Sequence, residues 1–324
     1  MANDLEGVMK SFKLLLLSTL TVACALPSWA GEPIDERMSA DGLSLINIEN
    51  LKGKVTIIGS DTDEVTIKGK LGESADRFVF EKSGNTLLAK VIEDKGYDYR
   101  NNDGGTVFTV KMPASLTMNF EGVSSDVNVK DLTGNVDVKT VSGDIEAKNL
   151  TESIDLSTVS GDIDSRNLSG KIRLSAVSGE IDDRNSSGRL RLKAVSGNLR
   201  STSSAKEINL AAVSGDMDFK FGDVEELVIS SVSGDVDGSL SLMNNGEIKM
   251  SGVSSDIALE FQEDINAEFR LTASAGGDLV NRITNDKVQK AKYGPSSKLN
   301  FSAGNGSAYV RGNVVSGEIK VSHR

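Results

Sequence analysis

Apolar and polar residues alternate along most of this chain, in short runs that end at Gly, Ser, Asn and Asp. The segment from Val141 to Thr158 reads VSGDIEAKNLTESIDLST and holds two such runs. Alternation with a period of two is typical of β-strands with one buried face, whereas a helix repeats its apolar positions every three or four residues. The pattern therefore predicts two short strands in this segment and no helix.

The segment recurs at a nearly constant interval along the chain. The string VSG or VSS begins at eight valines, with intervals of 18, 18, 18, 18, 18, 19 and 21 residues: Val123, Val141, Val159, Val177, Val195, Val213, Val232 and Val253. A unit this short cannot bury its own apolar side, so it must stack on its neighbours. The repeat predicts an all-β fold, a parallel β-solenoid (β-helix) of 18-residue coils with strands about 4.8 Å apart.

Equivalent positions in successive units form columns along the stack. One aliphatic column is expected to point inward: Ile145, Ile163, Ile181, Leu199, Met217 and Val236. The valines that open the repeats, such as Val159 and Val177, are expected in the same buried set. At the corners, Asn149 and its equivalents predict a stack of amides that bond to the next copy. Gly143 and its equivalents are expected to supply backbone angles that other residues avoid.

The first 30 residues have the features of a secretory signal peptide. Lys10 and Lys13 precede an apolar run, Leu14 to Leu26, and the segment closes with small residues up to Ala30. This run is shorter than the roughly 20 residues of a transmembrane helix, so none is expected in the mature chain. The signal peptide predicts an exported protein, which is periplasmic, at the cell surface or secreted. Cys24 lacks the upstream Leu of a lipidated cysteine, and its modification stays open.

The regular period covers only the middle of the chain and divides the mature sequence into three parts. Residues 31–120 are rich in predicted strands but lack the 18-residue period, and they are expected to form an N-terminal cap. Residues 121–260 hold the regular solenoid. Residues 261–324 contain irregular last coils and a C-terminal cap. Such caps are needed because an uncovered terminal coil exposes an unpaired strand edge.

Charge and composition exclude several classes of function. The chain has 36 Lys and Arg against 47 Asp and Glu, a net charge of −11, which argues against nucleic acid as a partner. His323 is the only histidine, and no cysteine follows residue 24. A Ser/His/Asp triad, a His-ligated metal site and a cysteine nucleophile are therefore not expected in the body of the chain. These absences favour a protein that is not an enzyme and needs no cofactor.

An outward column of acidic residues follows Ser-Gly in each repeat. Its carboxylates could hold Ca²⁺, which takes six to eight oxygen ligands. Alternatively, each carboxylate accepts backbone hydrogen bonds within its own turn, and the Glu180 and Asn198 found in the column favour this second interpretation. Whether a metal binds stays open. The candidate ligand-binding residues of the column are Asp144, Asp162, Asp216 and Asp235.

A second candidate site lies in the loop from Asp94 to Gly105, where Tyr97, Tyr99 and Arg100 gather. The loop resembles a calcium loop only loosely, because its Asp and Asn residues do not alternate. It is either a ligand-binding loop or a flexible surface loop. The two remaining tyrosines, at positions 293 and 309, also lie outside the regular repeats.

Four stretches of the chain are similar to a known bacterial family. They are the repeated VSGD with NLSG turns, GKVTIIGSDTDEVTIKG from Gly53, MPASLTMNFEGVSSDV from Met112, and GNGSAYVRGNVVSGEIKV from Gly304. Together they resemble the putative-adhesin family of β-solenoid domains, the DUF4097 group, over roughly residues 42 to 322. The resemblance implies a cell-envelope or secreted β-helix without established catalytic residues.

These observations predict an exported, non-enzymatic, adhesin-like β-solenoid that binds or organises a cell-envelope or extracellular ligand, a polysaccharide or a protein. One alternative is a β-helical polysaccharide lyase or hydrolase. Such an enzyme needs basic residues beside acids in a groove, and Arg166, Arg184 and Arg200 are the candidates for that role. Another alternative is a passive structural spacer of the envelope, whose faces need no ligand.

Overall fold

Each 18-residue repeat forms one coil of two strands. In the coil that begins at Ile145, β9 (Ile145–Leu150) is followed by β10 (Ser153–Thr158), and buried residues alternate along both. The structure, a computed structural model, describes residues 31–94 and 104–324, and within these ranges every regular element is a β-strand. Successive coils pair in parallel, with Ile145 opposite Ile163 of β11 (Ile163–Arg166). The predicted parallel β-solenoid is confirmed.

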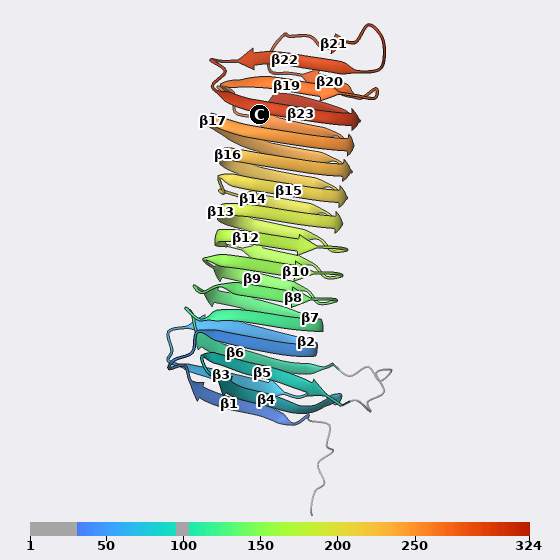
Figure 1. Cartoon of the computed structure of the whole chain (residues 1–324). Coiled ribbons are helices and arrows are strands. Elements are labelled where there is room, and N and C mark those ends of the chain that lie inside the picture. Colours follow the sequence, from blue (N-terminus) through green and yellow to red (C-terminus); the bar gives the residue numbers. More distant parts are fainter. Residues whose placement is uncertain (1–30, 95–103) are drawn as a thin grey trace, which may run out of the picture. The chain divides into compact units, whose positions relative to one another are not determined.

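The coils stack so that each contributes one strand to each of two faces (Figure 1). We call the outward side chains on these two sides the β9 face and the β10 face. The β9 face comprises β9, β11, β14 (Leu199–Ser203), β18 (Ile257–Phe261), β24 (Glu318–His323) and residues 181–186, 217–224 and 236–242. The β10 face comprises β8 (Val136–Thr140), β10, β12 (Ser169–Ala176), β15 (Glu207–Ser214), β23 (Ala308–Ser316) and residues 189–196, 226–233 and 247–254. Three long strands run through a corner from one face to the other: β13 (Ile181–Ser196), β16 (Met217–Ser233) and β17 (Val236–Ser254).

At the N-terminal end, a full coil lies inside the stack. β2 (Leu45–Ser60) pairs in parallel with β7 (Thr117–Leu132) on one side. On its other side it pairs in parallel with β5 (Thr86–Glu93) and β6 (Thr106–Pro113). Antiparallel strands then cover this end: β4 (Ala75–Ser83) on β5, β3 (Glu64–Lys70) on β6, and β1 (Pro33–Ser39) on β3. Parallel stacking thus begins at Leu45, without the 18-residue period.

At the C-terminal end, the last strands of the chain are also an interior coil. β23 lies between β17 and β19 (Ala267–Ala273), as Figure 1 shows. β24 lies between β18 and β20 (Asp278–Asn281). Beyond β19, β22 (Ser297–Ala303) and β21 (Gln289–Lys290) continue the sheet in antiparallel order. The end of the chain therefore inserts between coils that precede it in sequence.

The core consists of stacked columns, one of which matches the prediction. The six members of the Ile145 column are at most 2% exposed. The prediction for the valines that open the repeats is wrong, because Val159 is 44% exposed and Val177 is 42% exposed. Strand alternation explains the difference. Thr158 points into the core, so the residue after it faces outward.

The corner glycines are required by close stacking. A Cβ at Gly161 would lie 2.1 Å from the carbonyl oxygen of Gly143, and one at Gly179 would lie 1.8 Å from that of Gly161. None of these three glycines has a positive φ, so the expected backbone-angle role is wrong for them. It is confirmed at the equivalent Gly215 and Gly234, whose φ values are 138° and 118°. Each turn packs directly on the backbone of the turn before it. This contact fixes the register of neighbouring coils.

The opposite corner carries the predicted stack of amides. Asn149, Asn167 and Asn185 have φ of 54°, 55° and 60°, in the left-handed region that asparagine tolerates. Nδ2 of Asn167 donates to Oδ1 of Asn149 over 3.0 Å, and Nδ2 of Asn185 donates to Oδ1 of Asn167 over 3.4 Å. The side chains thus link the corners of three coils.

Candidate functional site

The acidic column runs along the edge of the β9 face, and its four candidate residues are all exposed. The backbone N–H of Asp162 donates to Oδ1 of Asp144 over 2.9 Å, and that of Asp235 donates to Oδ1 of Asp216 over 3.0 Å. The carboxylates therefore accept hydrogen bonds from the next coil. The expectation that they accept them within their own turn is wrong. Among the described residues, no group of three or more His, Cys, Asp and Glu is arranged to hold a metal ion.

The second set of candidates, Tyr97, Tyr99 and Arg100, falls outside the described residues. The remaining tyrosine of interest is Tyr309, which was expected outside the regular coils. The structure places it on β23, in the interior C-terminal coil, and its ring is exposed on the β10 face. The guanidinium of Arg311 lies 5.8 Å from the ring centroid. Sequence spacing did not reveal this position, because β23 joins the stack after the long insertion of β19 to β22.

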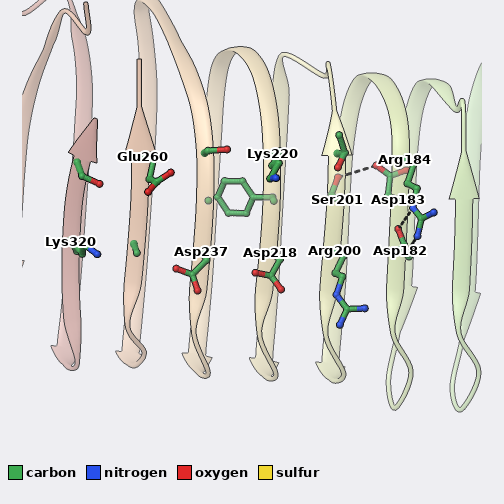
Figure 2. Close-up of a pocket in the computed structure, with 16 residues that line it drawn as sticks. Asp182, Asp183, Arg184, Arg200, Ser201, Asp218, Lys220, Asp237, Glu260 and Lys320 are labelled. Atoms are coloured by element: carbon green, nitrogen blue, oxygen red, sulfur yellow. Dashed lines mark hydrogen bonds and ion pairs between the residues drawn. The ribbon is translucent and has the colours of Figure 1, made fainter. Parts of the chain in front are cut away.

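A groove of about 470 Å³ lies on the β9 face (Figure 2). Asp182, Arg200, Asp218 and Asp237 follow one another across neighbouring strands of this groove. Partial burial, followed by repulsion from Asp218, raises the pKa of Asp237. The groove therefore brings carboxylates close together, and basic residues, among them Lys220, line it as well.

Two of the three arginines that are candidates for polysaccharide cleavage form ion pairs on this face. Nε of Arg184 donates to Oδ1 of Asp182 over 2.9 Å, and Arg200 forms an ion pair with Glu180. Both arginines line the groove, whereas Arg166 does not. An arginine whose guanidinium already pairs with a carboxylate is poorly placed to neutralise the acidic group of a substrate.

One carboxylate lies inside the solenoid. Asp183 has no exposed surface and accepts hydrogen bonds from the hydroxyls of Ser165 at 2.7 Å, Ser201 at 3.0 Å and Ser186. Burial raises its pKa, and the three hydroxyl donors oppose the rise. Sequence analysis missed this residue. The signal was present, since Asp183 stands in register with the buried Ser165 and Ala147.

The β10 face carries a cluster of basic residues that sequence analysis also missed. Its signal is the alternation KIRLS in β12 and RLRLK in β13. We call these five outward residues the basic tract: Lys171, Arg173, Arg189, Arg191 and Lys193. Nε of Arg173 donates to Asp155 over 2.8 Å, and Nε of Arg189 donates to Glu207 over 2.6 Å. A depression of about 480 Å³ borders the tract.

Comparison with known proteins identifies the family. The family model described as Toastrack DUF4097 matches residues 43–322. The chain belongs to the Toastrack family. The match spans the two interior end coils as well as the regular repeats, so the whole Toastrack stack is one family unit. No protein in the curated set matches this sequence.

Several solved structures resemble this Toastrack chain at low identity. A "putative lipid binding protein" from Parabacteroides distasonis is 13% identical, covers 90% of this chain and 97% of its own, and has a TM-score of 0.42. A "putative adhesin" from Bacteroides fragilis is 14% identical with the same coverage and a TM-score of 0.35. A "putative cell adhesion protein" from Clostridium sporogenes is 11% identical, covers 90% of this chain and all of its own, and has a TM-score of 0.23.

Proposed function

We propose that this Toastrack protein is an exported, non-enzymatic, adhesin-like module that binds a cell-envelope or extracellular ligand on its outward faces. The observation that carries the proposal is the fixed register of the coils, which pairs residues 18 apart from β8 to β15. Outward side chains therefore recur at the strand spacing of about 4.8 Å. A rigid array of this kind suits an extended ligand that makes many similar contacts, because little ordering entropy remains to be lost on binding.

The chemistry of the faces supports binding over catalysis. The candidate acids of the corner column accept backbone hydrogen bonds, and Arg184 and Arg200 are held in ion pairs. The one histidine of the sequence stands at position 323, on the last strand. A lyase or hydrolase needs a free acid–base pair around a bound sugar. In the β9-face groove, both arginines are paired with carboxylates, and Lys220 and Lys320 are the remaining basic residues.

Export is supported by the sequence features of residues 1–30, which lie outside the described residues. In the described ranges, the structure contains no helix that could cross a bilayer. The test is fractionation of bacteria that express a C-terminally tagged full chain or the same chain without residues 1–30. Recovery of only the full chain outside the cytoplasm supports export. Cytoplasmic retention of both proteins would contradict it.

The binding proposal is tested by incubating the purified protein with a panel of neutral and acidic envelope polysaccharides. Two quantities are measured: protein retained on the immobilised polysaccharide, and new reducing or unsaturated sugar ends released into solution. Retention without new ends supports the proposal. New ends that increase with protein concentration would establish the lyase or hydrolase alternative. If no polysaccharide retains the protein or yields new ends, glycan binding is contradicted, and a protein partner or a spacer role is favoured.

A further inference from the structure

The basic tract is an arrangement that the fold itself does not favour. In the pairing of β12 with β13, Lys171 lies opposite Arg189 and Arg173 lies opposite Arg191. Like charges directly opposite each other on neighbouring strands destabilise a sheet. On the outer sides of the pair, Arg173 faces Asp155 and Arg189 faces Glu207. Two adjacent coils nevertheless place only basic residues among their charged outward positions on this face.

The centre of the tract is free of ion pairs. The acids at its two margins engage Arg173 and Arg189. Within the described ranges, Lys171, Arg191 and Lys193 have no ion-pair partner, and all three are exposed. Unpaired cations in a chain whose net charge is −11 are a local exception to its overall electrostatics. They form an electropositive surface that attracts anionic groups.

The depression beside the tract is lined by four of its basic residues, by the uncharged column that continues from Arg191, and by Glu207 and Glu226. Along the stack from Arg191, the same outward column continues with Asn209 and Val228, which line the depression of about 480 Å³. Beyond them the column returns to basic residues, Lys249 and Arg311. A ligand that follows this column would meet the unpaired Arg191 at one end, two uncharged positions, and then two basic residues that pair with Glu247. The neighbouring row on its side carries glutamates. Tyr309 adds an exposed aromatic ring near the far end.

We infer that the basic tract binds an acidic polysaccharide, with the carboxylates of its uronic acid units on Arg191, Lys193 and Lys171. Guanidinium groups bind carboxylates through two parallel hydrogen bonds, which suits Arg191. The polysaccharide continues along the column of Arg191 toward Arg311, and the ring of Tyr309 in the neighbouring row can pack against a sugar. This inference rests on the proposed function and names the ligand class of one face.

Charge distribution favours a narrow polymer over larger anionic surfaces. In the same coils, the opposite side of the solenoid carries Asp162, Asp164, Glu180 and Asp182. A duplex nucleic acid or an anionic membrane would extend beyond the tract to the acidic remainder of the protein, which repels it within a Debye length of about 10 Å. A single polysaccharide chain can lie along the column of Arg191 without reaching the acidic side of these coils.

The test compares polygalacturonate with the same polymer after full methyl esterification, which removes the charge and keeps the sugar backbone. The variant R191E/K193E reverses two unpaired cations of the tract. The variant K148E/R166E is the matched control, because it makes the same change in net charge with two exposed residues of the β9 face that lack ion pairs among the described residues. Melting curves of the free proteins establish that each variant is folded.

We expect the wild type to bind polygalacturonate, to bind the methyl ester at least tenfold more weakly, and to lose affinity between about 50 and 200 mM salt. R191E/K193E should weaken binding by about tenfold or more, and K148E/R166E by much less. Equal losses in the two variants, equal binding of the ester, or binding only to phosphatidylglycerol vesicles or DNA would overturn the inference. Binding to neutral polysaccharides that R191E/K193E does not change would overturn it while leaving the proposed function intact.

Discussion

The backbone N–H of Asp162 donates a hydrogen bond to Oδ1 of Asp144, the equivalent residue of the preceding coil, over 2.9 Å. The same contact joins Glu180 to Asp162 over 2.7 Å and Asp216 to Asn198 over 3.0 Å. The column needs a side-chain oxygen at this height, and it does not need a negative charge. This explains why asparagine is found among the acids. The column resembles a calcium site, but its side-chain oxygens have a structural role.

Replacement of Asp162 separates the need for an oxygen from the need for a charge. Asp162→Asn keeps the acceptor and should leave the free energy of unfolding nearly unchanged. Asp162→Ala removes the acceptor and should cost about 1 kcal/mol. Chemical denaturation measures both, and calcium or EDTA should not move the midpoint of the wild type. If Asp162→Asn lowered the free energy of unfolding by more than Asp162→Ala does, or if calcium moved the midpoint, a metal-binding column would be supported.

The stacked turns predict a sharp difference between two glycines. Gly161→Ala places a methyl group 2.1 Å from the carbonyl oxygen of Gly143, so the coils must move apart and the melting temperature should fall by several degrees. Gly222 is the matched control, because no atom lies within 4 Å of a Cβ at that position and its φ is not positive. Gly222→Ala should be neutral or slightly stabilising. Similar effects of the two substitutions would contradict close stacking.

The buried carboxylate of Asp183 predicts a pH dependence of stability. Burial raises its pKa in the folded protein above the ordinary value of 3.8. Between the two pKa values the folded state binds more protons than the unfolded state, so stability falls as the pH rises through the folded pKa. Asp183→Asn keeps an acceptor for the serine hydroxyls and cannot ionise. It should therefore gain stability relative to the wild type as the pH rises above about 4.

The difference in melting temperature between Asp183→Asn and the wild type is the quantity to follow, because the contributions of the other carboxylates cancel in it. It is measured from pH 3.5 to 8 at constant ionic strength. A difference that stays constant over this range would show that Asp183 does not titrate with a raised pKa. A difference of opposite slope would indicate that the hydroxyl donors outweigh burial.

Much of the fold is readable from the sequence because the repeat imposes the same environment in every coil. The Ile145 column, the parallel register and the asparagine stack follow from an 18-residue period and strand alternation. Val159 was misplaced because it was assigned by its apolar character, although alternation from Thr158 puts it outside. A valine at an exposed corner costs little, so hydrophobicity alone does not locate it.

The end coils and the basic tract show where sequence reasoning stopped. β23 pairs with β17 although 53 residues, 255–307, lie between the two strands. The repeat period does not predict a coil that inserts out of order. The basic residues of β12 and β13 alternate as outward residues should, yet only the register places them opposite one another. The loop candidates Tyr97, Tyr99 and Arg100 lie outside the described residues, and their role stays a prediction.

The central claim is that alternate residues of each coil form the core and leave the others free for binding. Its most direct test is the unfolding temperature of Ile163→Asp beside those of Val159→Asp and Asp164→Ala. Ile163 is fully buried, so a carboxylate there should cost several kcal/mol and abolish cooperative unfolding near the wild-type temperature. The other two positions face outward, and each change should cost about 0.5 kcal/mol or less. An unchanged melting temperature for Ile163→Asp would contradict the arrangement of columns and the assignment of both faces.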